Sequence, residues 1–414
     1  MIDKIKKKLF SKKSIIGIIG LGYVGLPLAE LFSKKFKVIG YDINRKRIKE
    51  LKNGIDNNSV IRRKKKFNKK LVFSQSILDL KSSDFLIITV PTPVNKNKVP
   101  DLKLLNKAIY DIIKLGLKNK VIILESTIYP TLSQHYINLI LKKTKLKLNT
   151  DFIFGFSPER INPGDSLHRI NNIDKIVSTS TKKSSLLIKS LYKNIIKKVH
   201  TSEKLEESEM AKIIENSQRD INIAFINEVV MICNKLNIDP SKVLKLASTK
   251  WNFLKFSPGL VGGHCIGVDP YYLTHKLKSI KYNPKVILSG RLINENYHRY
   301  IINFISSIKR IKRNSKFLIL GGSYKEDCND LRNSKSLELY DIIKSKTKVF
   351  IYDPYIKKFN NYNFIKKPVK NEYDFVLITL HHKQFYKNNK FNFMNCVKKD
   401  GLIYDIKKAK FIKK

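Results

Sequence analysis

The sequence predicts an α/β protein with two doubly wound domains joined by a long central helix. Short apolar runs typical of buried strands alternate with helical patterns in the first third of the chain, and the alternation returns after residue 316. Between these parts lies a long stretch of helical periodicity without Pro or Gly. Apolar strands that alternate with helices indicate parallel sheets covered on both faces, so ligands are expected at the C-terminal ends of the strands.

The length and composition are those of a globular protein with more than one domain. A chain of 414 residues is long enough for two or three domains that each bury a core. Hydrophobic residues make up 42% of the chain, which argues against extensive disorder. Four cysteines are too few for a disulfide framework at this length, so we expect a reduced, cytoplasmic protein.

The charge balance is strongly basic, with 82 Lys and Arg against 34 Asp and Glu and a net charge of +48. Such a charge raises the hypothesis of a nucleic-acid or membrane partner. The lysines, however, are spread along the whole chain, which is rich in Lys, Ile and Asn together. This favours a general compositional bias, which would still suit anionic ligands. The alternative is a polyanion surface at the basic runs 6–8 and 62–66.

Six apolar runs predict strands in the N-terminal part, and two segments between them predict helices. The strands are expected at residues 14–20, 37–42, 84–90, 121–127, 153–159 and 175–180. The helices are expected at residues 24–34 and 101–115. Together they predict an N-terminal domain over residues 1–202.

The middle of the chain is predicted to be helical. Apolar residues recur at helical spacing over residues 203–236, which predicts one helix of about 50 Å. A helix of this length between two α/β domains is typical of a spine or a dimer interface. Helical patterns continue to about residue 312 around a Gly-rich stretch at 257–270, so a central region is expected over residues 203–312.

The last hundred residues predict a second, smaller α/β domain over residues 313–414. Strands are expected at residues 317–322, 348–354, 374–380 and 401–406, with a helix at 334–346. No sequence repeat relates the two α/β parts beyond this shared alternation.

Gly20, Gly22 and Gly25 form a G-x-G-x-x-G pattern between a predicted strand and a predicted helix. In this context the glycines permit a tight turn, close approach of the backbone to a pyrophosphate, and close packing of the helix on the strand. The apolar run at residues 15–32 imitates a signal peptide or a membrane span, but its glycines favour the turn. The alternative is a Gly-rich turn without a ligand. The predicted cofactor contacts of this Rossmann turn are Gly20, Gly22, Tyr23, Val24 and Gly25.

Asp42 ends the second predicted strand, 22 residues after Gly20. A carboxylate there accepts hydrogen bonds from both ribose hydroxyls and repels a 2′-phosphate, which predicts NAD rather than NADP as the cofactor. Arg47 is also a predicted cofactor contact. Together with Arg45 it would weaken the preference if its side chain faced the ribose.

Cys265 lies in a Gly-rich loop at residues 252–270, beside His264 and four residues before Asp269. Small neighbours favour access, and an accessible thiolate is a nucleophile. The alternative is a small buried thiol. Cys233 and Cys396 have apolar neighbours and are predicted to be structural, whereas Cys328 lies in a polar loop and its role stays open. No Cys and His spacing resembles a zinc site, so no metal is expected.

Lys212 and Asn216 are four residues apart on the predicted central helix and therefore share a face. Glu209 and Asp220 lie about one turn beyond them on either side. Isolated pairs of this kind are usually solvated, so the pair needs support from elsewhere in the chain before it indicates a site.

Seven ordered segments give that support, because they resemble the UDP-glucose/GDP-mannose dehydrogenase family of NAD-dependent UDP-sugar 6-dehydrogenases. The resemblance covers nearly the whole chain. It implies an N-terminal Rossmann domain that binds NAD, a long central helix that forms a homodimer, and a C-terminal Rossmann-like domain that binds UDP. The segments are GLGYVGLPLA (20–29), VPTP (90–93), EST (125–127), SPER (157–160), the helix with Lys212 and Asn216, GGHCIGVDP (262–270) and YKEDCNDLR (324–332).

The resemblance implies oxidation of the sugar C6 alcohol to a carboxylate with two NAD and without release of the aldehyde. Cys265 would add to the aldehyde as a thiohemiacetal, which then loses a second hydride and becomes a thioester that water hydrolyses. Lys212 and Asn216 would stabilise the developing oxyanion. Asp269 would position water or accept protons.

Other residues are assigned to ligand contacts by the same resemblance. Glu159 would be a further base or water-holding group, and Thr127 would hold water near the nicotinamide. Additional contacts to the cofactor would come from Thr92, Thr127 and Arg332. Contacts to the substrate would come from Glu159, Arg160, Lys212, Asn216, Leu254, Lys255, Phe256, Ser257, Pro258, Gly262, Tyr324 and Lys325.

The substrate is expected to be a UDP-N-acetylhexosamine that serves as a precursor of surface polysaccharide. UDP-glucose dehydrogenases commonly carry a second Glu four residues after the first, where this chain has Pro163. UDP-N-acetylglucosamine is favoured, followed by the galacto epimer, UDP-N-acetylmannosamine and UDP-glucose.

Two further classes of function are alternatives to the dehydrogenase. One is a nucleic-acid-binding protein on a Rossmann scaffold, and the other is an inactive NAD-binding regulator. The distributed charge and the lack of a basic motif interleaved with aromatics argue against the first. The intact Cys265, Lys212, Asn216 and Asp269 argue against the second, so neither a nucleic-acid nor a membrane partner is expected.

Overall fold

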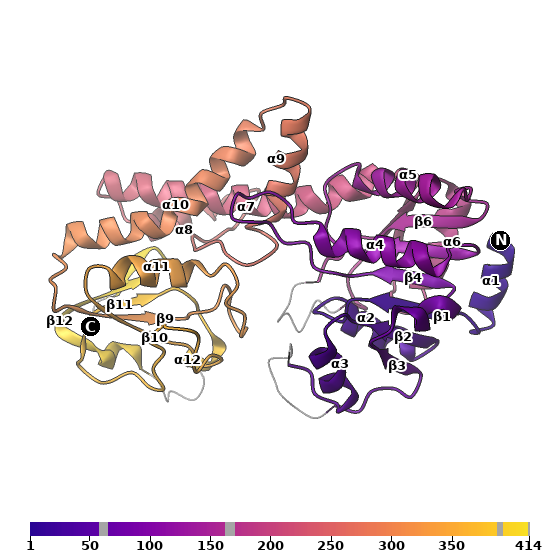
Figure 1. Cartoon of the computed structure of the whole chain (residues 1–414). Coiled ribbons are helices and arrows are strands. Elements are labelled where there is room, and N and C mark those ends of the chain that lie inside the picture. Colours follow the sequence, from indigo (N-terminus) through magenta and orange to yellow (C-terminus); the bar gives the residue numbers. More distant parts are fainter. Residues whose placement is uncertain (58–64, 162–169, 387–391, 413–414) are drawn as a thin grey trace. The chain divides into compact units, whose positions relative to one another are not determined.

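A computed structural model gives the structure of the protein and describes residues 1–57, 65–161, 170–386 and 392–412 (Figure 1). The chain forms two compact units, Met1–Glu215 with Tyr271–Ile280, and Asn216–Pro270 with Lys281–Lys414. We find no helix in the described ranges with the length and apolarity needed to cross a bilayer.

The first unit contains an eight-stranded sheet in the order β3-β2-β1-β4-β5-β6-β7-β8, counted over the described residues. Six of the strands match the predicted runs, whereas β3 and β8 were not predicted. The strands are β1 (Ile15–Ile19), β2 (Lys37–Tyr41), β3 (Leu71–Ser74), β4 (Phe85–Ile88), β5 (Lys120–Leu124), β6 (Phe152–Phe156), β7 (Lys175–Thr179) and β8 (Val199–Ser202).

The expectation of parallel strands is wrong at one pair, because β6 and β7 run antiparallel with Gly155 opposite Thr179. The other neighbours in this sheet are parallel. Parallel neighbours need a long crossover, usually a helix. The described residues of this connection, 157–161 and 170–174, form no helix, and an antiparallel return does not require one.

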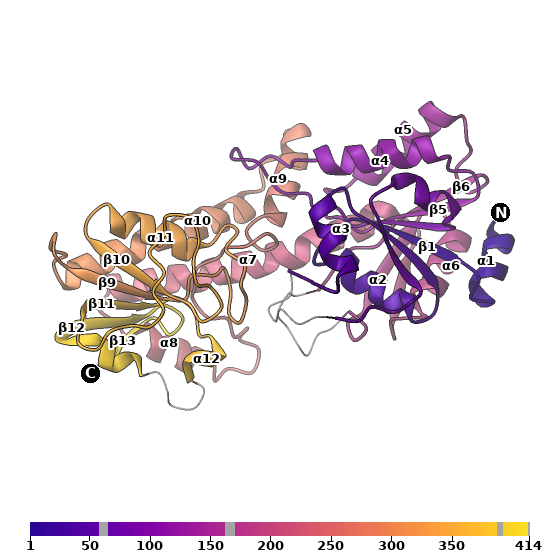
Figure 2. The ribbon, with the colours of Figure 1, turned by 60° about the horizontal axis from the view of Figure 1, so that its bottom comes forward.

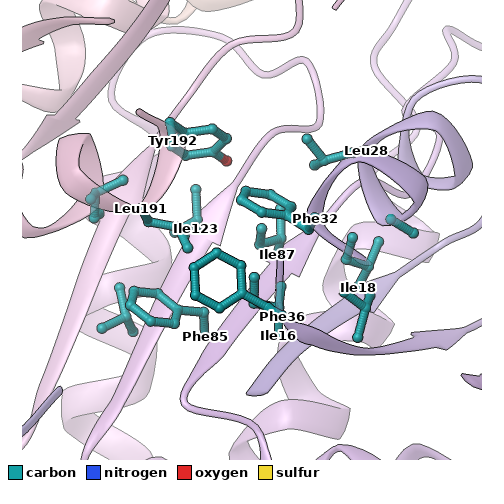
Figure 3. Close-up of a cluster of buried hydrophobic side chains, with 14 of the residues drawn as sticks. Ile16, Ile18, Leu28, Phe32, Phe36, Phe85, Ile87, Ile123, Leu191 and Tyr192 are labelled. Carbon is teal, nitrogen blue, oxygen red and sulfur yellow. The ribbon is translucent and has the colours of Figure 1, made fainter. Parts of the chain in front are cut away.

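Helices cover both faces of this sheet (Figure 2). On one face they bury a cluster in which Phe32, Phe36 and Phe85 lie against the strands (Figure 3). The helices of that face are α1 (Ile2–Phe10), α2 (Gly25–Ser33), α3 (Arg45–Lys52) and α6 (Lys182–Tyr192). The other face is covered by α4 (Lys103–Leu115), α5 (Leu132–Thr144) and the 3₁₀ helix η1 (Ile77–Ser82).

The predicted long helix is confirmed as α7 (Leu205–Lys235). The division between the two units falls within this helix. It is followed by α8 (Pro240–Ala247), α9 (Asp269–Ser279) and α10 (Lys285–Ile308).

The second unit contains a five-stranded sheet in the order β10-β9-β11-β12-β13, again over the described residues. The four predicted strands are present, and β13 adds an antiparallel edge that was not predicted. Its strands are β9 (Lys316–Leu320), β10 (Lys348–Tyr352), β11 (Tyr373–Ile378), β12 (Val397–Asp405) and β13 (Lys410–Ile412). Its helices are α11 (Lys335–Lys344), which with α10 covers one face, and α12 (Lys383–Tyr386) and the 3₁₀ helix η3 (Phe393–Cys396) near the other.

The first strand of each sheet's βαβ unit ends in the same hydrogen-bonded turn. In the first unit, the backbone N–H of Leu21 donates to Oδ2 of Asp42 at 2.8 Å. In the second, the N–H of Gly322 donates to Oδ2 of Asp353 at 2.8 Å. The environments of the two carboxylates differ. Asp353 is buried, and the same oxygen also lies 3.1 Å from Nε2 of His382.

Candidate functional site

The predicted dinucleotide turn has the tight geometry that its glycines require. Gly25 begins α2, and a Cβ on this residue would lie 1.8 Å from the carbonyl oxygen of Gly20. No side chain can be accommodated at that distance. The third glycine of the pattern therefore lets α2 start directly against the end of β1.

A cavity of about 380 Å³ opens at the C-terminal ends of β1, β2 and β4 in the first unit. Its walls combine the glycine turn, the carboxylate of Asp42 and apolar residues of α4, which is the mixture expected for a nucleoside. The residues that line it include Gly20, Leu21, Gly22, Asp42, Asn44, Arg47, Thr89, Val90, Pro91, Leu104, Lys107, Ala108 and Asp111. This lining fits the nucleoside part of the expected NAD, whose ribose Asp42 is predicted to contact.

Asp42 is held in place by the backbone. Its Oδ2 accepts from the N–H of Leu21, and its Oδ1 accepts from the N–H of Asn44 at 2.8 Å. The nearby Arg47 is buried, and its Nε donates to the carbonyl of Leu21 at 3.0 Å while its Nη1 pairs with Asp56 at 2.8 Å. The guanidinium therefore supports the turn through internal contacts, and the negative charge of Asp42 remains at the cavity wall.

Thr92 and Thr127 lie together, although 35 residues separate them in the sequence. The hydroxyl of Thr92 donates to the carbonyl of Thr127 at 2.7 Å. The hydroxyl of the buried Tyr272 on α9 donates to the carbonyl of Thr92 at 2.6 Å. The loops after β4 and β5 are thus tied to each other, and α9 is tied to the first of them.

Glu159 follows β6 and is almost completely buried. Its Oε1 accepts from the backbone N–H groups of Arg160 and Ile161 at 2.7 and 2.6 Å, and its Oε2 lies 3.6 Å from Nζ of Lys175. The guanidinium of Arg160 pairs with Glu215 at 2.8 Å. Pro163, which carried the argument about the substrate, lies outside the described residues.

Lys212 and Asn216 share a face of α7, as the spacing predicted, and both are buried. Glu209, one turn before Lys212, has a structural role. Its carboxylate accepts from the backbone N–H groups of Thr131 and Ser133, which belong to the start of α5. This contact fixes the first part of α7 to the helix layer of the first unit.

Cys265 is half-buried, and its loop leads directly into α9. Its carbonyl accepts from the N–H of Val268 at 3.1 Å and from that of Asp269 at 2.8 Å. The carboxylate of Asp269 accepts from Nδ2 of Asn216 at 2.6 Å. The structure therefore brings three predicted site residues of the second unit into one chain of contacts.

Tyr324, a predicted substrate contact, and Arg332, a predicted cofactor contact, lie beside the loop that carries Cys265. Gly263 has a φ of +79°, and a Cβ there would lie 2.5 Å from Cδ2 of Tyr324. Arg332 forms a two-pronged ion pair with Asp330, and its Nη2 lies 3.3 Å from Nε2 of His264. Burial, with a further effect of Arg332, lowers the pKa of His264 to about 4, so its imidazole is neutral at pH 7.

The segment 254–258 is fixed at its C-terminal end by an amide clamp. Asn227 on α7 donates to the carbonyl of Gly259 at 3.1 Å and accepts from the N–H of Gly259 at 2.9 Å. Asn294 on α10 in turn accepts from Asn227 at 2.9 Å. Before this clamp, Leu254, Lys255 and Ser257 are exposed.

A buried ionic network connects α7, α10 and α11 in the second unit. Nη1 of Arg291 lies 2.6 Å from Oδ1 of Asp220, and the two side chains are 2% and 0% exposed. Arg291 also pairs with Glu295, which Lys335 approaches to 2.6 Å. Asp220 is therefore part of the support of α7.

The three other cysteines are buried, and none of the four forms a disulfide bond. Burial raises the pKa of each of these thiols, to about 11 in Cys396. The open question about Cys328 is thus answered in favour of a structural role. The described residues contain no group of His, Cys, Asp and Glu side chains that suits a metal ion.

Some polar residues of these sites could not be found by sequence reasoning. Glu125 and Lys175 form a buried ion pair at 2.8 Å, although a charged residue at the end of a strand usually indicates a solvated position. Asn227 and Tyr272 act through backbone carbonyls, which leave no residue pattern to detect. Among these residues, only Glu125 lies in a segment that carries the family resemblance, EST at residues 125–127.

Family profiles match most of the chain. The UDP-glucose/GDP-mannose dehydrogenase family, NAD binding domain, matches residues 14–196. The central domain of the same family matches residues 206–296, and its UDP binding domain matches residues 318–410.

Individual relatives agree with these profiles. The chain is 42% identical to Protein CapL of Staphylococcus aureus over 406 residues, which cover 95% of each chain. It is 41% identical over 405 residues to a UDP-N-acetyl-D-glucosamine 6-dehydrogenase of Pseudomonas aeruginosa, covering 95% of this chain and 96% of the relative. A solved UDP-D-ManNAc dehydrogenase from Pyrococcus horikoshii superposes with a TM-score of 0.84 at 28% identity, covering 96% of both chains.

Proposed function

The chain belongs to the UDP-glucose/GDP-mannose dehydrogenase family, and on this premise we propose that it oxidises UDP-N-acetylglucosamine at C6 to the corresponding uronic acid. It is an NAD-dependent UDP-sugar dehydrogenase. The observation that carries the proposed C6 chemistry is the position of Asp269 at the start of α9, directly after the loop of Cys265, with Asn216 bound to Asp269. The choice of sugar rests on the 41% identity to a UDP-N-acetyl-D-glucosamine 6-dehydrogenase.

In the proposed reaction Cys265 is the covalent nucleophile. NAD supplies the hydride acceptor for each of the two oxidation steps. The thiolate of Cys265 adds to the C6 aldehyde that the first oxidation leaves, and a C–S bond forms. Loss of the second hydride gives a thioester, and attack by water breaks the C–S bond and releases the carboxylate and the thiol.

The charged and amide groups assigned to the reaction suit this sequence of steps. We assign stabilisation of the oxyanion to Lys212 and Asn216, by charge and by hydrogen bond. Asp269 would hold a water molecule or take up a proton, and its bond to Asn216 orients it. Glu159 would act as a further base, and Thr127 would hold water near the nicotinamide.

The three segments of the chain are proposed to divide the work. Residues 1–202 would bind NAD, with contacts from the glycine turn, Asp42, Arg47, Thr92 and Thr127. Residues 203–312 would carry the Cys265 loop, and residues 313–414 would bind the UDP group. Further contacts to substrate or cofactor would come from Arg160, the 254–258 segment, Gly262, Tyr324, Lys325 and Arg332.

A homodimer and a cytoplasmic role in making precursors of surface polysaccharide complete the proposal. Large apolar side chains that are exposed on the helices of the second unit would supply the apolar contacts of such a dimer. Phe225 on α7 is 55% exposed, Leu246 on α8 is 71% exposed and Leu292 on α10 is 65% exposed.

We expect NAD to be used in preference to NADP by at least about tenfold in kcat/KM, which corresponds to about 1.4 kcal/mol. Asp42 repels a 2′-phosphate, and the guanidinium of Arg47 is engaged by Leu21 and Asp56. Steady-state kinetics with both cofactors measure the ratio. Asp42→Ser is the matched variant and should reduce the ratio of kcat/KM with NAD to kcat/KM with NADP. Equal use of the two cofactors by the wild-type enzyme would contradict the assignment of Asp42.

We expect UDP-N-acetylglucosamine to exceed UDP-glucose by at least about tenfold in kcat/KM. The motivation is Pro163 in place of a second Glu, together with the identity to the Pseudomonas enzyme. NADH formation and product mass should be measured with a panel that includes UDP-N-acetylgalactosamine and UDP-N-acetylmannosamine. A preference for either of these epimers would replace UDP-N-acetylglucosamine as the proposed substrate. A tenfold preference for UDP-glucose would overturn the assignment to UDP-N-acetylhexosamine dehydrogenases.

A further inference from the structure

A buried polar cluster lies against Glu159 in the first unit. Lys175 begins β7, and its Nζ lies 2.8 Å from Oε2 of Glu125 and 3.6 Å from Oε2 of Glu159. The side chains of Glu125 and Lys175 are 0% and 2% exposed. Tyr192 at the end of α6 donates its hydroxyl to the other carboxylate oxygen of Glu125. The ammonium of Lys175 thus lies close to two carboxylates, which follow different strands.

This arrangement is costly for Glu125. Burial, opposed by the attraction of Lys175, raises the pKa of Glu125 to about 7. A buried ion pair is weak evidence for stability, because the cost of desolvating both charges can exceed their attraction. The pair therefore calls for an explanation besides folding, and the proximity of Lys175 to Glu159 offers one.

The two oxygens of Glu159 are treated differently by the protein. Oε1 accepts from two backbone N–H groups, which fixes the plane of the carboxylate. Oε2 is buried and accepts no hydrogen bond from the described residues. At 3.6 Å the ammonium of Lys175 favours the charged form without occupying the lone pairs of Oε2. This geometry keeps acceptor capacity on Oε2 and places a cation beside it.

We propose that Lys175, anchored by Glu125 and Tyr192, is a positioning residue that orients the carboxylate of Glu159 and keeps it ionised during turnover. The proposal rests on the role of Glu159 as a base given under Proposed function. Lys175 does not touch the substrate in this proposal, and it acts through Glu159.

The charged and titratable groups around Glu159 come from several elements. Glu125 reaches the cluster from the end of β5, Lys175 from β7 and Tyr192 from α6. Arg160 is adjacent in sequence, but its guanidinium is engaged by Glu215 at 2.8 Å and by the carbonyl of Asp174 at 3.0 Å. The cationic influence on Oε2 is therefore assigned to Lys175.

The test compares the acidic limbs of the pH profiles of kcat/KM in two variants that share a neutral residue 125. We expect Glu125→Gln to leave the limb close to that of the wild type, because burial raises the pKa of Glu125 to about 7 and this carboxyl is already largely protonated on the acidic side of neutrality. In Glu125→Gln/Lys175→Met the acidic limb should lie about one pH unit or more above that of Glu125→Gln, because a positive charge near Glu159 is removed. Lys175→Arg keeps the cation and should keep the wild-type limb.

Lys120 provides a matched control at the other end of β5. It is also a buried lysine, and its Nζ donates to the carbonyls of Lys81 and Ser83 at 2.7 Å each. Lys120→Met should lower the melting temperature without moving the acidic limb. If Lys120→Met shifted the limb as much as Lys175→Met does in the Glu125→Gln background, loss of any buried lysine would produce the effect, and the proposal would fail.

Glu159→Gln separates failure of this inference from failure of the proposed function. If that variant loses activity while the limbs of Glu125→Gln and Glu125→Gln/Lys175→Met coincide, Lys175 has no positioning role and the dehydrogenase assignment stands. If Glu159→Gln makes the uronic acid at the wild-type rate, the base role of Glu159 is wrong and the positioning role falls with it. Should that double variant not fold, Glu125→Gln/Lys175→Gln takes its place with the same expected rise of the limb, and limbs of this variant and of Glu125→Gln that coincide would overturn the proposal.

Discussion

Cys265→Ala is expected to reduce formation of the uronic acid by at least about 10³-fold, because no other group can take the aldehyde into a covalent intermediate. Binding of NAD and of the UDP-sugar should stay nearly unchanged, since the thiol is needed for neither. Cys265→Ser should also fail to give net product, because a hydroxyl adds poorly to the aldehyde and an ester hydrolyses more slowly than a thioester. Mass spectrometry of the enzyme quenched during turnover, beside a product assay, measures both effects.

Cys396→Ala is the matched control for this experiment. Cys396 is buried at the end of η3, where it packs against the second sheet, and burial raises the pKa of its thiol to about 11, so it remains protonated at pH 7. This variant should keep wild-type turnover, and the covalent sugar adduct should still be detected on the quenched enzyme. If Cys265→Ala makes uronic acid near the wild-type rate, the thioester mechanism is wrong and Cys265 is only a loop residue.

Arg291→Met is expected to lower the free energy of unfolding by about 3–5 kcal/mol. The guanidinium lies 2.6 Å from Asp220, whose side chain is 0% exposed. Removing the cation leaves a buried carboxylate whose remaining hydrogen bond, among the residues that the structure describes, comes from the amide of Asn294. Urea denaturation followed by circular dichroism measures the loss, and Arg291→Met/Asp220→Asn should recover most of it.

The same variant should show a defined pH dependence. Burial already raises the pKa of Asp220 in the wild type, against the attraction of Arg291. Without Arg291 the protonated form is favoured further, so the deficit relative to the wild type should shrink as the pH falls. A deficit that is equal at neutral and acidic pH would mean that lost packing of the Arg291 side chain, and not the unpaired charge, causes the destabilisation.

The buried strands could be predicted because their apolar runs are continuous. The edge strands could not. Val72 on β3 is 48% exposed, and only Val199 on β8 is buried among its four residues. An edge strand that buries one face carries a short, mixed pattern, and such a pattern cannot be told from a loop.

The site residues divide in the same way. Gly25, Asp42 and Cys265 could be proposed from the sequence because each chemistry requires that residue type at that spacing. The contact between Asn216 and Asp269 joins residues 53 positions apart and depends on where α9 starts. The charged residues Glu125 and Lys175 could not be identified as buried, because the side chains that exclude water from them come from α6 and from three separate strand ends.

The two equivalent turns differ in what surrounds their carboxylates. Asp353 accepts from Gly322 and Ser323 and lies beside His382, whereas Asp42 lines the nucleoside cavity. If both oxidations of the proposed reaction use the dinucleotide site at Asp42, spent cofactor would have to be exchanged for fresh cofactor halfway through each cycle. The bond to Cys265 would then be the tether that keeps a half-oxidised sugar from escaping meanwhile.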